Sequence, residues 1–146
     1  MRILVQRSLN SSVSVNKKIV GKIEKGLVLF VGFTNSDTEK EIEYLINKVL
    51  NLRIFDDENG VMNKSILDVG GEILSISQFT LYADTKKGNR PSYIEAMRND
   101  EAIKLYNLFN EKLSEKINVQ TGIFGADMVV NINNDGPVTI MLESRS

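Results

Sequence analysis

The sequence predicts an α+β fold: a single domain over residues 1–146, with a curved, barrel-like, mostly antiparallel β-sheet and two or three helices. Three observations lead to this prediction. Short apolar or alternating segments, typical of strands, crowd both ends of the chain. Two longer segments between them repeat apolar residues at helical intervals. Only turn-forming residues separate these segments, and no linker or internal repeat divides the chain.

The N-terminal segments predict a meander of strands. Residues 3–5 are apolar, and Val13 and Val15 alternate with polar neighbours. Residues 27–31 are continuously apolar, which is typical of a strand that is covered on both faces. We therefore expect this last segment to be the central strand.

A helix is predicted next, over residues 39–51. Either Ser36 with Glu39 or Thr38 with Glu41 has the spacing of a capping box. The apolar residues that follow at helical intervals are Ile42, Leu45, Ile46, Val49 and Leu50. One face of this helix should therefore pack on the sheet.

A turn at residues 56–60 and a long buried strand over residues 72–82 are expected after the helix. Period-two alternation places Ser77 and Phe79 on one face of this strand and Gln78 and Thr80 on the other. By itself, such alternation is what any half-buried strand shows.

The remaining chain predicts more helix and then strands. Ser92 with Glu95 indicates a short helical piece, and Asn99 or Asp100 caps a longer helix. The apolar stripe of the longer helix comprises Ala102, Leu105, Tyr106, Phe109, Leu113 and Ile117. Strands are expected at residues 118–121, 128–133 and 138–143, with a tight turn at residues 134–137.

The composition excludes several kinds of site. The chain has no His and no Cys, so it has no Ser-His-Asp or Cys-His catalytic unit, no disulfide and no zinc knuckle. We expect neither a metal nor a cofactor. A net charge of −1 argues against wrapping a long nucleic acid, and no apolar run is long enough to span a membrane. The expected location is the cytoplasm.

A few residues stand out as candidates for chemistry. Thr80 is a potential nucleophile, but no obvious base accompanies it. Phe124 and Met128 suit either core packing or an adaptable slot for a flat base. The basic residues of one loop suit either plain solvation or a contact with phosphate; they are Lys86, Lys87 and Arg90.

Two longer motifs carry a family resemblance. SQFTLYAD at residues 77–84 and NDGPVT at residues 134–139, in this order, resemble the signature pair of the D-aminoacyl-tRNA deacylases, also called D-tyrosyl-tRNA deacylases. Further segments that resemble the family are MRILVQR at the start, NLRIFDDENGVMN at 51–63, KGNRPS at 87–92 and FGADM at 124–128.

The resemblance implies an enzyme that hydrolyses the ester between a D-amino acid, or glycine mischarged on alanine tRNA, and the 3′ end of the tRNA. It further implies a homodimer with an active site that is shared between subunits. In such a dimer the Gly136–Pro137 bond is cis and enters the partner's site, where its carbonyl oxygens hold the substrate's α-amino group and exclude an L side chain. Arg7 would brace this loop.

The resemblance also implies the site residues. The scissile ester would lie beside Ser77, Gln78, Phe79 and Thr80. The backbone N–H of Phe79 is the expected oxyanion donor, with the tRNA 2′-OH assisting the attack. The adenine would lie against Phe124 and Met128, with Ala102 keeping the wall small. Such chemistry requires no histidine, because an aminoacyl ester is already activated.

Two alternatives remain open at this point. One is a non-catalytic nucleic-acid-binding module on the same fold, which the basic loop and the missing base favour. The other is an esterase in which Thr80 is the nucleophile.

Overall fold

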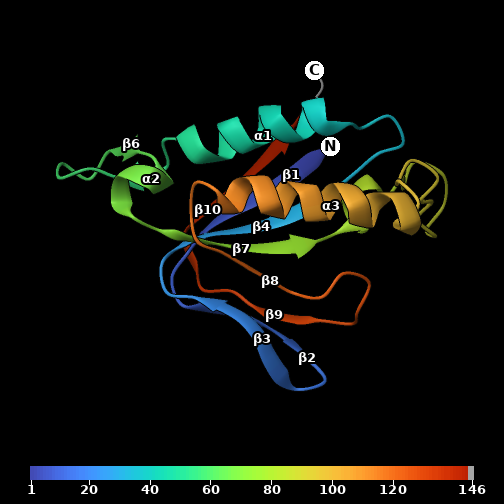
Figure 1. The fold of residues 1–146 in the computed structure, drawn as a ribbon, viewed down its shortest axis with the longest axis horizontal. Coiled ribbons are helices and arrows are strands. Elements are labelled where there is room, and N and C mark those ends of the chain that lie inside the picture. Colours follow the sequence, from blue (N-terminus) through green and yellow to red (C-terminus); the bar gives the residue numbers. More distant parts are fainter. Residues whose placement is uncertain (145–146) are drawn as a thin grey trace.

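A computed structural model describes residues 1–144, and they form three layers (Figure 1). The central layer is a five-stranded sheet in the order β10-β1-β4-β7-β8, made of β10 (Asn134–Glu143), β1 (Arg2–Ser8), β4 (Gly26–Gly32), β7 (Glu72–Ser77) and β8 (Val119–Thr121). A second sheet has the order β3-β2-β9, made of β3 (Lys18–Ile23), β2 (Ser11–Val15) and β9 (Val129–Asn131). The helices are α1 (Glu39–Asn51), α2 (Ile66–Val69) and α3 (Asn99–Ser114), and β5 (Phe55–Asp56) pairs with β6 (Met62–Lys64).

The predicted α+β class is confirmed, with one correction to the shape of the sheet. Most strand pairs are antiparallel, but β4 with β7 and β7 with β8 are parallel. Within residues 1–144, β10 and β8 are the free edges of the large sheet, so the sheets do not close into a barrel. None of the helices in this part of the chain has the length and apolar character needed to cross a membrane.

Strand β4 is covered on both faces, as its continuous apolar sequence predicts. Leu27 and Leu29 belong to the core between the large sheet and the helices α1 and α3. Val28 points the other way, into the core between the two sheets. This alternation follows from the period of two along a strand.

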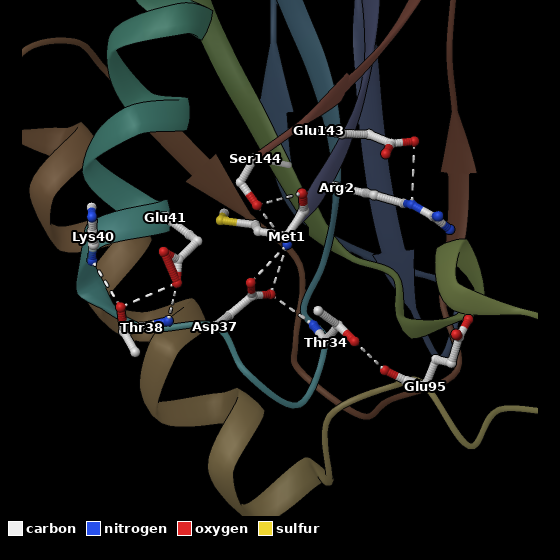
Figure 2. Close-up of polar contacts among 10 residues, drawn as sticks. All are labelled: Met1, Arg2, Thr34, Asp37, Thr38, Lys40, Glu41, Glu95, Glu143 and Ser144. Carbon is white, nitrogen blue, oxygen red and sulfur yellow. Dashed lines mark hydrogen bonds and ion pairs between the residues drawn. The ribbon is translucent and has the colours of Figure 1, made fainter. Parts of the chain in front are cut away.

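Helix α1 begins and ends where the sequence predicts. The capping box is the second of the two alternatives: the Thr38 hydroxyl accepts a hydrogen bond from Lys40 N, and Thr38 N donates to the Glu41 carboxylate (2.8 Å; Figure 2). All five residues of the predicted stripe are buried.

An ion pair ties the start of β1 to the loop before α1. The ammonium group of Met1 lies 2.8 Å from the Asp37 carboxylate, and neither group is exposed (Figure 2). Asp37 also accepts a hydrogen bond from Thr34 N (2.7 Å), and the Met1 ammonium donates to the Ser144 hydroxyl (2.9 Å). These contacts join the chain after β10 to the beginning of β1.

The predicted long strand over residues 72–82 is wrong in its second half. Strand β7 ends at Ser77, and Phe79–Tyr82 form a 3₁₀-helix, η1. Tertiary contacts favour this turn, because the Arg2 guanidinium packs over the Tyr82 ring (4.5 Å) and donates to the Leu81 carbonyl (2.8 Å). The predicted alternation of faces therefore stops at Ser77.

Three further predictions need correction. The short helix expected at Ser92 is absent from the described chain, because Ser92 and Asp84 exchange backbone hydrogen bonds (2.8 and 2.9 Å). Helix α3 does begin at Asn99, but the residue at its N-cap is Arg98, which makes no side-chain cap. The turn expected at residues 134–137 instead belongs to β10.

Candidate active site

A cavity of about 320 Å³ opens where β7 ends. Its walls come from β4, the junction of β7 with η1, the start of α3, and the loop between β8 and β9 (residues 122–128). The lining residues include Gly32, Ser77, Gln78, Phe79, Met97, Asn99, Ala102, Phe124, Asp127 and Met128. Segments far apart in the sequence therefore meet around one space.

The cavity brings together six of the nine residues that the sequence singled out. They are Ser77, Gln78, Phe79, Ala102, Phe124 and Met128. In the described chain, Thr80, Gly136 and Pro137 are not part of its wall. Sequence reasoning missed Met97, which lines the cavity. It lies just before α3, and no motif marks it.

Phe79 lines the cavity and is also exposed. The residue is 49% exposed, and its ring meets the ring of Tyr93 edge-on, with centroids 5.0 Å apart. Phe79 is also the first residue of η1. The first N–H groups of a helical turn have no partner within that turn, so this position presents a backbone donor.

Thr80 is not among the residues that line the cavity. Its side chain is exposed, and its hydroxyl accepts a hydrogen bond from the Gln78 side-chain amide. The 3₁₀ turn begins at Phe79, so Thr80 is no longer part of a strand. Gln78 is thereby held at the point where β7 ends.

A buried tyrosine supports the aromatic part of the wall. The rings of Tyr106 and Phe124 have centroids 5.8 Å apart. The Tyr106 hydroxyl donates to the Ser75 carbonyl (2.8 Å) and accepts from the Ser75 hydroxyl (3.3 Å). Burial raises the pKa of Tyr106, so it stays a neutral phenol that connects Phe124 to β7. The helical pattern of apolar residues predicted that Tyr106 belongs to the core, but it did not predict the contacts of Tyr106 with Phe124 and Ser75.

The Gly136–Pro137 segment forms an exposed bulge on β10. Gln6 of β1 pairs with Thr139, but Ser8 pairs with Asn134, so the intervening residues of β10 bulge opposite Arg7. The peptide bond between Gly136 and Pro137 is cis.

Arg7 braces this bulge from below. Arg7 is 9% exposed, and its guanidinium donates to the Asp135 carbonyl (3.3 Å) and the Ile54 carbonyl (2.8 Å). It also forms ion pairs with the carboxylates of Asp135 (3.3 Å) and Asp56 (3.5 Å). The bulge is thus held to the loop after α1 while its tip faces outward.

The site offers little formal charge. Asp127 is the acidic residue among those that line the cavity. Among residues 1–144 there is no group of three or more acidic, His or Cys residues that could hold a metal ion. The basic residues Lys86, Lys87 and Arg90 are exposed on the loop that leads to Tyr93. The arrangement suits binding through shape, ring contacts and backbone groups.

Comparisons with known proteins agree with the sequence motifs. The family model described as D-Tyr-tRNA(Tyr) deacylase matches residues 4–143. A protein from Clostridium novyi (strain NT) named D-aminoacyl-tRNA deacylase is 57% identical, over 99% of this chain and 98% of its own length. One of the same name from Brevibacillus brevis is 56% identical, over 99% of this chain and all of its own.

Two solved structures share the fold. One, titled c-Myc DNA Unwinding Element Binding Protein, superimposes with a TM-score of 0.95 at 43% identity over the whole of both chains. The other, titled as a probable eukaryotic D-amino acid tRNA deacylase, has a TM-score of 0.83 at 19% identity over 97% of each chain, and it supports the fold alone. On the family model and the full-length relatives, this chain belongs to the D-Tyr-tRNA(Tyr) deacylase family.

Proposed function

We propose that this protein removes D-amino acids from tRNA by hydrolysing the ester at the 3′ end. Membership of the family makes it a hydrolase that acts on ester bonds. The observation that carries the proposal is the cavity, because it gathers the two ends of the site, residues 77–79 and the loop at 124–128, around one space. In this role the enzyme acts in the cytoplasm, where aminoacyl-tRNA is made and used.

The terminal adenosine is proposed to bind between Phe124 and Met128. An aromatic ring and a polarizable thioether are suitable partners for the flat face of a base. Ala102 is 7% exposed and has no side chain beyond Cβ, so it leaves room for the base beside α3. A cavity of about 320 Å³ lies within the usual range for small-ligand sites.

The ester is proposed to lie at the junction of β7 and η1. The backbone N–H of Phe79 stabilises the negative charge that develops on the carbonyl oxygen, and Ser77 and Gln78 complete this wall. The 2′-OH of the tRNA assists the attack of water on the ester carbonyl, and the ribose 3′-oxygen leaves with a proton. Such a reaction uses positioning in place of a side-chain base.

Chirality is proposed to be read by the Gly136–Pro137 bulge of a second subunit. Within the described chain this exposed bulge does not line the chain's own cavity, which supports the proposal that another copy supplies it. Its carbonyl oxygens would accept hydrogen bonds from the substrate's α-ammonium group and leave no space for an L side chain. Arg7 supports the bulge through the neighbouring Asp135 carbonyl.

Glycine is proposed as a second substrate. It has no side chain for the bulge to reject, so glycyl-tRNA, including glycine mischarged on alanine tRNA, enters the same site. Discrimination by exclusion alone predicts this outcome.

The test compares D-Tyr-tRNA with L-Tyr-tRNA under single-turnover conditions. We expect rapid release of D-tyrosine, no release of L-tyrosine, and release of glycine from glycyl-tRNA. Equal rates on the two tyrosyl esters would overturn the chiral proposal. Tight binding of uncharged RNA without turnover would instead identify a nucleic-acid-binding module.

A further inference from the structure

We infer that Gly122 is a positioning residue for the adenosine subsite, because the thioether of Met128 occupies the space that a side chain at position 122 would need. The identity of the ligand rests on the proposed function, whereas the contact itself does not. Gly122 is the first residue after β8 and lies outside every motif that the sequence singled out.

The contact between the two residues is unusually close. A Cβ on Gly122 would lie far inside van der Waals distance of the Met128 sulfur. The next neighbours, Val13 and Ile76, would lie at 3.4 and 3.6 Å, which are ordinary contacts. A side chain at position 122 would therefore displace Met128 and leave the core beside it in place.

Backbone conformation does not explain this glycine. Gly125 in the same loop has a φ of 78°, a left-handed value that favours glycine, but Gly122 is not among the residues with positive φ. An alanine at position 122 can adopt the native backbone. Position 122 instead has no room for a side chain. Glycine often occurs where another group approaches the backbone this closely.

The contact closes a loop that forms much of the cavity wall. Gly122 and Met128 lie at its two ends, and Ala126 N donates to the Ile123 carbonyl within it (3.2 Å). The lining residues that the loop contributes are Phe124, Gly125, Ala126, Asp127 and Met128. Met128 also packs on the core between the two sheets, so its thioether joins that core to the cavity.

The direction of the effect follows from this placement. A Cβ on Gly122 forces the flexible thioether out of its groove, and Met128 already lines the cavity. The displaced side chain changes the surface on which the adenine would lie. Binding of the 3′ end is impaired, while the ester-bearing wall at residues 77–79 keeps its geometry.

The experiment is a double-mutant cycle of Gly122→Ala and Met128→Ala, read by steady-state hydrolysis of D-Tyr-tRNA. We expect Gly122→Ala to raise KM about tenfold with kcat within about twofold, as for a methylene-sized change in a pocket. In the Met128→Ala background the same substitution should have almost no further effect, because nothing remains to be displaced. An equal penalty in both backgrounds, or none in either, would overturn the inference.

A methyl NMR spectrum tests the contact without any activity. The chain has five methionines, and Met97 lines the same cavity. Gly122→Ala should move the Met128 methyl signal strongly, and those of the exposed Met62 and Met141 not at all. An unmoved Met128 signal would refute the contact. If Gly122→Ala moves the Met128 signal but the wild-type protein fails to hydrolyse D-Tyr-tRNA, the proposed function is refuted and the contact stands.

Met62→Ala is the matched control for removing a thioether. Met62 lies on β6, is 53% exposed and is remote from the cavity wall. Its KM should equal that of the wild type, and thermal unfolding of every variant shows whether the fold is retained.

Discussion

Asp37 shows how much one buried carboxylate can hold in place. It pairs with the Met1 ammonium, and both groups are shielded from water. It also accepts a hydrogen bond from Thr34 N, so the loop before α1 closes on the start of β1. Without its partner, either charge would face a large desolvation cost.

Replacement of this carboxylate should therefore be costly. Asp37→Asn leaves the buried ammonium without a counter-charge, and we expect a loss of about 3 to 5 kcal/mol in the free energy of unfolding. Urea denaturation measures it. Asp100→Asn is the control, because its pair with Arg98 is exposed and should be worth less than about 1 kcal/mol. Equal losses in the two variants would contradict the role of the buried pair.

Thr80 is a second case at the scale of one residue. Since it lies outside the cavity wall and holds the Gln78 amide, we expect Thr80→Ala to keep kcat/KM for D-Tyr-tRNA within about threefold, whereas loss of a nucleophile costs several orders of magnitude. Single-turnover hydrolysis gives the answer. An active Thr80→Ser beside an inactive Thr80→Ala would establish Thr80 as the nucleophile.

At the scale of elements, sequence patterns succeeded where local contacts decide the outcome. Helix α1 has its cap and its apolar stripe within one segment, so its bounds could be predicted. The chain after β7 forms η1 because Arg2, which lies far away in the sequence at the start of β1, packs on Tyr82. No local pattern contains that contact, and the predicted strand was therefore too long.

The turn between β5 and β6 gives a prediction for pH. Asp57 accepts hydrogen bonds from the backbone N–H groups of Val61 and Asn59, which hold the pKa of its carboxyl below the ordinary value of 3.8. A lowered folded pKa means that the stabilisation is complete above pH 3.8 and is lost as the pH falls through the folded value. An NMR titration of Asp57 should have its midpoint below 3.8. A midpoint equal to that in urea would contradict these bonds.

At the scale of the whole molecule, the proposed site is divided between the cavity and the bulge on β10. The motifs in the sequence named residues in both places, but spacing along the chain cannot tell which residues share one subunit. The structure shows Ser77, Gln78 and Phe79 at the cavity, and Gly136 with Pro137 on a separate exposed edge. The sequence of one chain therefore does not predict how two copies assemble around the proposed site.

Complementation between inactive chains tests that assembly. Phe124→Ala removes a cavity wall. Gly136→Ala disturbs the bulge, since its Cβ would lie 2.8 Å from Val138 at a φ of 117°. Each homodimer should be inactive. Co-refolded in equal amounts, the two chains should recover about a quarter of wild-type activity, because half of the dimers are mixed and each has one intact site. No recovery in a mixture shown to contain heterodimers would refute a shared site.

The pairing of β1 with β10 also sets an order of events during synthesis. Every residue of the cavity wall lies before position 131, whereas the bulge belongs to β10, the last strand of the described chain. On the ribosome, β1 must wait with one edge unpaired until β10 emerges, and contacts of such long sequence separation form slowly. The nascent chain therefore carries its binding wall before it carries the loop that we propose to distinguish D from L.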